Sequence, residues 1–209
     1  VRVAERQQLL RAEAVVDHGH GGGRWEEIAG APEVAFMHSV LLPNTQRVLY
    51  WGYTRADQSR VWDYSTPAGS YLLPANQPAD SPGLDPNTSD MWSAEHTVLD
   101  TAAGTVLIHG GFSPDKAFNF DPAALTWTRV GDTAENRFYS TTLTLADSTA
   151  VTLYGPSAKN FERYTHGVGW AAPVGFAAPM NHHQFYPWTY LLPDGRLFIA
   201  GPHDPTHRV

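Results

Sequence analysis

Four stretches of the sequence repeat one pattern at intervals of about fifty residues. Each stretch begins with a polar or aromatic residue, continues as a run of alternating apolar residues, makes a turn and ends in a second apolar run. The leucine just before each turn marks the equivalent positions, which are Leu42, Leu99, Leu145 and Leu192. The steps between these leucines are 57, 46 and 47 residues. A period of this length indicates supersecondary units that stack because none can bury a core alone.

Alternation with a period of two indicates β-strands, and about four short strands fit into each repeat. This arrangement is typical of a kelch-type β-propeller blade. We therefore expect an all-β chain in which residues 24–209 form a partial β-propeller domain. The repeats amount to about three and a half blades, as part of a seven-bladed propeller. Residues 1–23 are expected to form an N-terminal helix, over 3–15, followed by a Gly-rich linker.

The repeats leave unpaired pieces at both ends of the pattern. Trp25 has the character of an outer-strand aromatic but precedes the first repeat, and only the first half of the fourth repeat is present. Because bare strand edges and bare sheet faces are a liability, we expect a second polypeptide to complete the propeller. The sequence starts without Met and without a signal peptide, which favours a mature or trimmed chain.

Composition narrows the function classes. A formal net charge of −7 argues against nucleic acid as a partner, and no run of eighteen apolar residues is available for a membrane span. Cysteine is absent, so disulfides and thiolate metal sites are excluded. Lys116 and Lys159 are the two lysines among 14 basic residues, and this bias toward Arg, with many Ala, Pro and Gly, suggests a bacterial protein. We expect it to be secreted or displayed at the cell surface.

Two sets of residues are expected to share one face at the start of the innermost strands. The positions six before the marker leucines are Phe36, Ser93, Tyr139 and Tyr186. The positions four before them are His38, Glu95, Thr141 and Trp188. In a propeller these positions ring one mouth of the central channel, where they either form a site or only plug the channel. His96 lies on the opposite face and is expected to be structural, and either His182 or His183 could face the mouth.

Several motifs resemble the galactose oxidase and glyoxal oxidase family of copper radical oxidases. These motifs are WEEI, RVWD, WSAEHTVLD, NRFYSTTLTLAD and FYPWTYLLPDGRLFIAGP, and the resemblance extends over about residues 24–209. In that family a cysteine sulfur is joined to the ring of a tyrosine that binds copper and is oxidised to a radical. The resemblance implies that Tyr139 is this tyrosine and a metal ligand. It puts Ser93 at the cysteine position and Glu95 at a position that is usually glycine.

Serine cannot form the thioether, so the Cys-Tyr radical cofactor is not possible in this chain. The sequence therefore predicts a galactose-oxidase-like propeller enzyme with an altered channel-mouth site. It could be a copper oxidoreductase acting on an alcohol, an aldehyde or a sugar. The predicted catalytic residues are Tyr139, Ser93 and Glu95, and the predicted substrate-binding residues are Tyr186, Trp188, His38 and Arg137.

Other functions fit the same residues. One is a non-catalytic propeller that binds a carbohydrate or a protein through Trp188, Tyr186 and Phe36. Another is a lyase or hydrolase in which Glu95 and Tyr139 act as acid and base. A third is an engineered Cys-to-Ser variant of a true oxidase. Fold alone does not choose among these functions.

Overall fold

The structure is a computed structural model, and it describes residues 37–52, 59–65, 70–78, 91, 93–112, 115–155, 158–176, 185–200 and 207–208. Within these residues every regular element is a β-strand, and all paired strands are antiparallel. The all-β prediction is therefore confirmed for the described part of the chain. The expected helix over 3–15, the linker and Trp25 lie outside the described residues.

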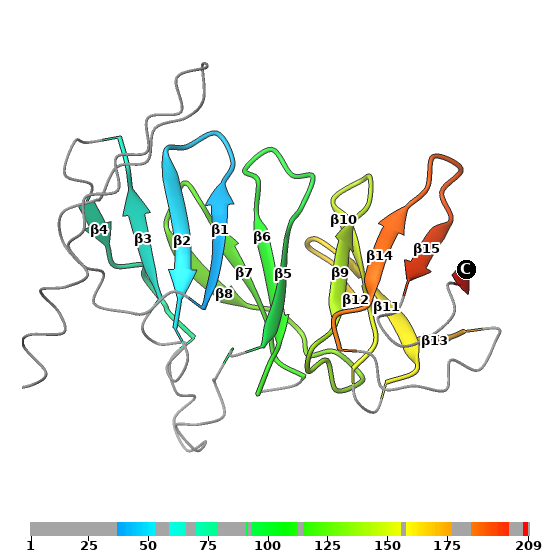
Figure 1. The fold of residues 1–209 in the computed structure, drawn as a ribbon. Helices are drawn as coiled ribbons and strands as arrows, with labels where there is room; N and C mark the ends of the chain where they lie inside the picture. The colour runs from blue at the N-terminus through cyan, green and yellow to red at the C-terminus, as the bar shows by residue number, and fades with distance from the viewer. Residues whose placement is uncertain are drawn as a thin grey trace, which may run out of the picture.

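The strands form four sheets that follow one another in chain order (Figure 1). Sheet 1 contains β1 (His38–Leu42), β2 (Arg47–Trp51), β3 (Arg60–Asp63) and β4 (Ser70–Leu72). Sheet 2 contains β5 (Ala94–Val98), β6 (Val106–Gly110), β7 (Ala117–Asp121) and β8 (Thr126–Arg129). Sheet 3 contains β9 (Thr141–Thr144), β10 (Thr149–Leu153), β11 (Asn160–Thr165), β12 (Gly169–Trp170) and β13 (Val174–Gly175). Sheet 4 contains β14 (Trp188–Leu191), β15 (Leu197–Ala200) and β16 (His207–Arg208).

The four repeats read from the sequence correspond to these four sheets. Each marker leucine ends or directly follows the first strand of its sheet, at the turn into the second strand. The backbone N–H groups of Leu99, Leu145 and Leu192 each donate across this turn at 2.8 Å. Leu42 and Leu99 are fully buried, whereas Leu145 and Leu192 are only partly buried, so the four equivalent positions are not equally buried.

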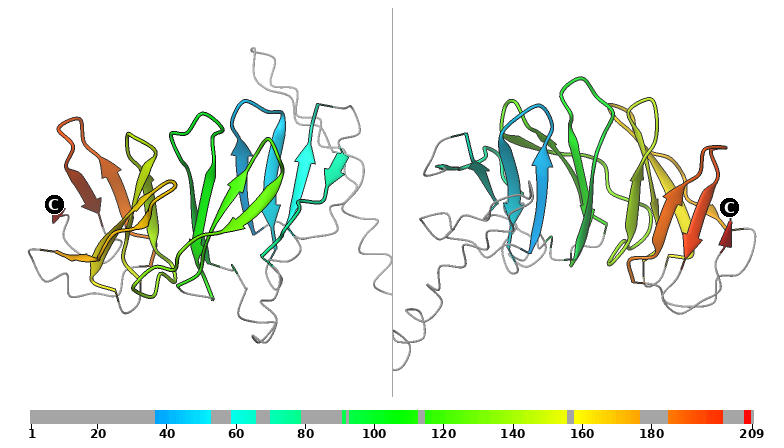
Figure 2. Two further views of the ribbon diagram at one scale, coloured as in Figure 1. Left: turned by 180° about the vertical axis from the view of Figure 1, so that it is seen from behind. Right: turned by 45° about the horizontal axis from the view of Figure 1, so that its top comes forward.

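The core lies between successive sheets, because each apolar cluster draws on two neighbours in the row. The first cluster joins sheets 1 and 2 and includes Trp51, Val106 and Ile108. A second joins Leu107 of sheet 2 to Tyr164 of sheet 3, and a third joins sheets 3 and 4. Burial of apolar surface between sheets, at about 25 cal/mol per Å², therefore stabilises the row. The views in Figure 2 show the same row from behind and tilted forward.

The turns that join the first and second strands lie at the top of Figure 1, so the starts of the first strands gather at the opposite end. Contacts between β5 and β9 and between β9 and β14 bring these starts near one another. Ser93, Glu95, Tyr139 and Tyr186, which were predicted from the sequence to belong to the site, lie at this end of the row.

Two glycines allow the backbone to pass closely at this same end. A Cβ atom on Gly155 would lie 1.9 Å from the carbonyl oxygen of Asn136, and one on Gly110 would lie 2.2 Å from that of Arg137. Such distances are impossible for a real side chain, so glycine is required where the segment leading to Tyr139 crosses the ends of β6 and β10.

Candidate active site at the start of the first strands

Three residues at matching repeat positions share a left-handed backbone. Ser93, Tyr139 and Tyr186 have φ values of 62°, 55° and 50°. Residues other than glycine rarely adopt this region, which costs on the order of 1–3 kcal/mol each. Backbone hydrogen bonds between sheets hold the conformation, from Tyr139 N–H to the Ser93 carbonyl at 3.4 Å and from Tyr186 N–H to the Tyr139 carbonyl at 2.8 Å. The equivalence of these positions is therefore visible in the backbone as well as in the sequence.

Tyr139 lies at the centre of a group of aromatic rings. Its ring centroid is 4.0 Å from that of Phe138, 4.9 Å from that of Phe185 and 5.0 Å from that of Tyr186. The contacts to Phe185 and Tyr186 are edge-to-face, an arrangement that aromatic quadrupoles favour. The ring is partly buried. Neighbours from sheets 3 and 4 thus determine where the phenol of Tyr139 is held.

Tyr186 connects the aromatic group to the polar residues. Burial is the main effect that raises the pKa of its phenol, to about 12. A hydrogen bond with the Ser93 side chain lowers this pKa, whereas the nearby Glu95 and Tyr139 raise it. Each of these influences requires proximity. The structure therefore brings Ser93 and Glu95 of sheet 2 together with Tyr139 and Tyr186, as the shared strand face led us to expect.

Glu95 is a partly buried acid near the start of β5. Burial raises the pKa of its carboxyl to about 8, and a backbone hydrogen bond at His96 offsets this only in part. At neutral pH the protonated form therefore predominates, and the carboxyl can donate a hydrogen bond or a proton. Its cross-strand neighbour is His109, whose pKa is lowered to about 3, chiefly by burial. His109 is fully buried and its Nε2 pairs with the Thr142 hydroxyl at 2.7 Å, so it belongs to the support behind the site.

Ser93 is almost completely buried, with 2% of its surface exposed. Its backbone N–H donates to His38 Nε2 at 3.2 Å, which links sheet 2 to sheet 1. The His38 ring stacks on Trp51 at 5.1 Å, and burial together with His96 lowers its pKa to about 4. His38 is thus a neutral acceptor that holds the Ser93 backbone. The Nε2 atom of His38 is therefore used in a hydrogen bond between two sheets.

His96 has the structural role that the sequence indicated. Its ring packs edge-on against Trp51 at 5.3 Å, and burial lowers its pKa.

Arg137 supports the site from within sheet 3. Its side chain is fully buried and pairs with the equally buried Glu162 at 2.6 Å. The guanidinium also donates to the carbonyl oxygens of Tyr154 and Asn160 and to the Asn160 side chain. With its donors used in this way, Arg137 is not available to a substrate, and we assign it to the framework in place of the substrate-binding role expected from the sequence. Its effect is to fix the segment that carries Tyr139.

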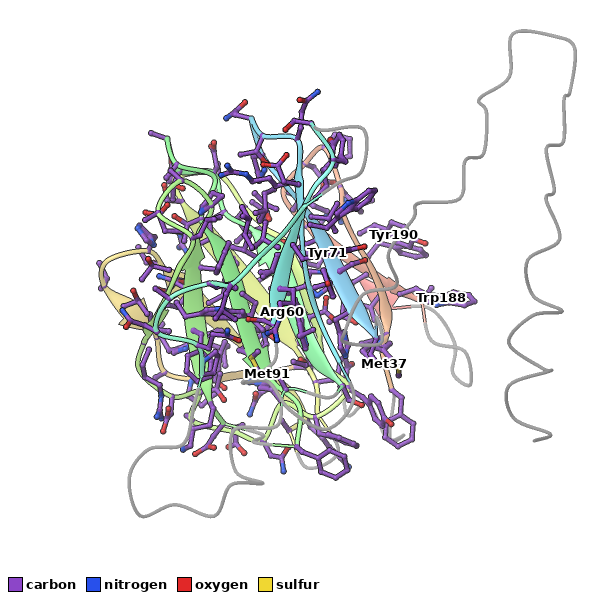
Figure 3. All side chains as sticks on the ribbon, turned by 90° about the vertical axis from the view of Figure 1, so that its left-hand side faces the viewer. Met37, Arg60, Tyr71, Met91, Trp188 and Tyr190 are labelled. Atoms are coloured by element: carbon purple, nitrogen blue, oxygen red, sulfur yellow. The ribbon has the colours of Figure 1, made fainter. Side chains whose placement is uncertain are left out.

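Trp188 lies apart from the group around Tyr139. It is exposed on β14 beside Tyr190, and Figure 3 shows both rings projecting from the same edge of the molecule. Within the described residues it makes none of the ring contacts that surround Tyr139. The positions Phe36, Trp92, His182 and His183 lie outside the described residues.

Phe112, Phe138 and Phe185 were not predicted as neighbours of the site. Phe112 contacts Phe138 at 5.4 Å, and Phe185 contacts Tyr139. Phe138 and Phe185 each precede a member of the Ser93, Tyr139 and Tyr186 set by one residue. The Phe-Tyr pair that the sequence repeats at 138–139 and 185–186 was the signal that could have identified two of them.

Copper is the metal that the family resemblance implies, and the described residues fit it only in part. Tyr139 offers a phenol oxygen, but no group of three or more His, Asp or Glu side chains in the described ranges is placed to hold a metal ion. The carboxyl of Glu95 lies nearby, and binding a metal ion would require it to lose the proton that burial favours. Further ligands would have to come from outside the described residues.

Comparisons with known proteins agree with this architecture. No protein-family model matches the sequence. The chain is 27% identical over 197 residues to Art an 7 of Artemisia annua, whose assignment as an aldehyde oxidase is provisional. That match covers 79% of this chain and 33% of the Artemisia protein.

Among solved structures, the chain resembles a novel fungal alcohol oxidase with catalytic diversity in the AA5 family, solved in complex with copper. The TM-score is 0.65 at 18% identity, over 89% of this chain and 41% of the fungal one. The similarity shows a shared fold, and the chain spans less than half the length of either protein. No helix in the described part of the chain is long and apolar enough to cross a membrane.

Proposed function

We propose that this chain forms part of a galactose-oxidase-like propeller oxidoreductase that acts on a small alcohol, aldehyde or sugar. The observation that carries the proposal is the meeting of Ser93, Glu95, Tyr139 and Tyr186 at one end of the row of sheets. Tyr139 occupies the position that the resemblance assigns to the copper-binding tyrosine. The two similar proteins, a copper-bound alcohol oxidase and a provisional aldehyde oxidase, support the same reaction class.

In this proposal the four sheets are blades of a larger propeller that another polypeptide completes. The exposed face of β14 supports it. Val40 and Leu143, two residues before their marker leucines, pack in the clusters that join their sheets to the next sheet. Thr97, at the same position of sheet 2, pairs with Thr144 of sheet 3 at 2.7 Å. Tyr190 is the equivalent residue of sheet 4 and is 55% exposed, which leaves room for a further sheet.

Bound copper would supply the redox chemistry, and Tyr139 is the described residue that would hold it. Other parts of the site act through this chain's own groups. Glu95, protonated at neutral pH, can donate a hydrogen bond to a substrate oxygen, and Tyr186 keeps its phenolic proton for the same purpose. Ser93 replaces the sulfur that family members use, so a tyrosine–cysteine radical is not part of the proposed site. Secretion or display at a bacterial cell surface is part of the same proposal.

A second candidate is metal-free acid–base chemistry, and the placement of Glu95 beside Tyr186, with a carboxyl pKa that burial raises to about 8, favours it. A carboxyl with a pKa near the working pH can both give and take a proton efficiently. This alternative keeps the site and changes only the reaction.

The experiment is a turnover assay on the complete protein with copper added and with copper chelated. Primary alcohols, aldehydes and sugars are supplied with dioxygen, and formation of hydrogen peroxide is followed. We expect copper-dependent oxidation that Tyr139→Phe abolishes and that Tyr71→Phe, at the far edge of sheet 1, leaves unchanged. Turnover of a substrate in chelator without peroxide would support the acid–base alternative, and equal activity in wild type and Tyr139→Phe would overturn the proposal.

A further inference from the structure

The candidate site is bordered by five aromatic side chains that touch one another in series. Phe112 contacts Phe138, Phe138 contacts Tyr139, and Tyr139 contacts both Phe185 and Tyr186. We call this set the aromatic rim. Its members come from the segments that follow β6 and precede β9 and β14, so three sheets contribute to it.

The rim is unusually exposed for apolar rings that pack together. Phe112 is 53% exposed and Phe185 is 51% exposed. Beside Tyr186, at one end of the rim, lie Ser93, which is buried, and Glu95, which is partly buried. Exposed apolar rings beside buried polar groups are typical of small-molecule sites, in which a few polar groups orient a mostly apolar ligand.

The side chains of the aromatic rim favour binding of some classes of ligand over others. A sugar carries hydroxyl groups all round its ring and needs donors and acceptors on several sides. The phenyl side chains of Phe112, Phe138 and Phe185 provide none. They do provide flat faces and edges for another aromatic ring, in stacked or edge-to-face contact.

We infer that the aromatic rim binds small molecules with an aromatic ring, and that it directs a hydroxyl or carbonyl substituent toward Tyr186 and Glu95. The inference rests on the proposed function and names the substrate class of that same site: aryl-substituted alcohols or aldehydes, in preference to sugars.

The test measures binding to the complete protein in the presence of a chelator, so that neither metal nor turnover is needed. The probes are benzyl alcohol, cyclohexylmethanol and galactose, and dissociation constants come from ligand-observed NMR or calorimetry. Two variants, Phe112→Ala and Phe185→Ala, each remove one exposed ring, and because both rings are half exposed the variants should fold. Tyr71→Ala, which removes an exposed ring far from the site, is the matched control.

Benzyl alcohol should bind more tightly than cyclohexylmethanol, and galactose should bind most weakly. Loss of one ring contact should weaken benzyl alcohol binding about 3- to 10-fold, while Tyr71→Ala leaves it unchanged. Absence of benzyl alcohol binding, equal or tighter binding of galactose, or no effect of either rim variant would overturn the inference. If benzyl alcohol binds at the rim but no alcohol is oxidised, the inference stands and the proposed oxidase function fails.

Discussion

The backbone N–H of Tyr186 donates to the carbonyl oxygen of Tyr139 at 2.8 Å, and both residues adopt positive φ values. Tyr139 makes the same link to Ser93 at 3.4 Å. Residues 46 or 47 positions apart in the sequence are thereby coupled one to the next across the sheets. A substitution that shifts the backbone of one of these three residues should therefore also displace the side chains of the other two.

Gly155→Ala should destabilise the fold and disturb the site together. The added Cβ would lie 1.9 Å from the Asn136 carbonyl oxygen, so the segment that leads to Tyr139 must move. We expect a loss of about 1–3 kcal/mol in the free energy of unfolding, as for overpacking elsewhere. Urea denaturation measures it, with Gly131→Ala as the control because nothing lies within 4 Å of a Cβ there. Equal stability of the two variants would contradict the close approach.

Glu162→Gln should be strongly destabilising. It removes the charge that neutralises the buried guanidinium of Arg137 and one acceptor for the N–H groups of Ala134 and Glu135. Breaking a buried ion pair in this way costs about 3–5 kcal/mol. The exposed pair between Asp194 and Arg196 provides the control, because Asp194→Asn should change the free energy of unfolding far less than Glu162→Gln does. Thermal and urea unfolding of both variants would show whether the two costs differ as expected.

Glu95 should make stability fall as the pH rises. Its pKa is about 8 in the folded chain and near 4.5 without burial, so between these values the folded state holds a proton that the unfolded state has released. The free energy of unfolding then decreases with rising pH across this range and levels off above pH 8. Glu95→Gln lacks the effect, so its stability relative to wild type should increase from pH 4.5 to 8. A carboxyl titration midpoint near 4.5, measured by NMR on the folded protein, would refute the assignment.

Tyr190→Ala should behave as a core substitution in the complete protein, although Tyr190 is exposed in this chain. If a further sheet covers β14, the loss of a large buried ring costs about 3 kcal/mol. Val168→Ala, in the turn between β11 and β12, is the control and should change stability by less than about 0.5 kcal/mol. A neutral Tyr190→Ala would mean that the face is open and that the propeller is not continued there.

The sequence predicted the repeat, the strands and the face that carries Ser93, Glu95, Tyr139 and Tyr186, because strand alternation and spacing are local properties of the chain. It could not predict the role of Arg137. That residue precedes Tyr139 by two positions and was expected to reach a substrate, but its partners Glu162 and Asn160 lie in β11, about 25 residues later. Which charge pairs with which depends on tertiary packing. The contact between Phe112 and Phe138 was missed for the same reason, since it forms only in the folded structure.

Absorption and electron paramagnetic resonance spectra of the complete protein with Cu(II) test the central claim, that Tyr139 is the reactive centre of the site. A phenolate ligand gives a charge-transfer band that phenylalanine cannot. We predict that wild type shows this band, that Tyr139→Phe loses it, and that Tyr186→Phe retains it, with no thioether-type tyrosyl radical on oxidation because Ser93 carries no sulfur. Identical copper spectra for wild type and Tyr139→Phe, or a strong tyrosyl-radical absorbance in oxidised wild type, would contradict the account.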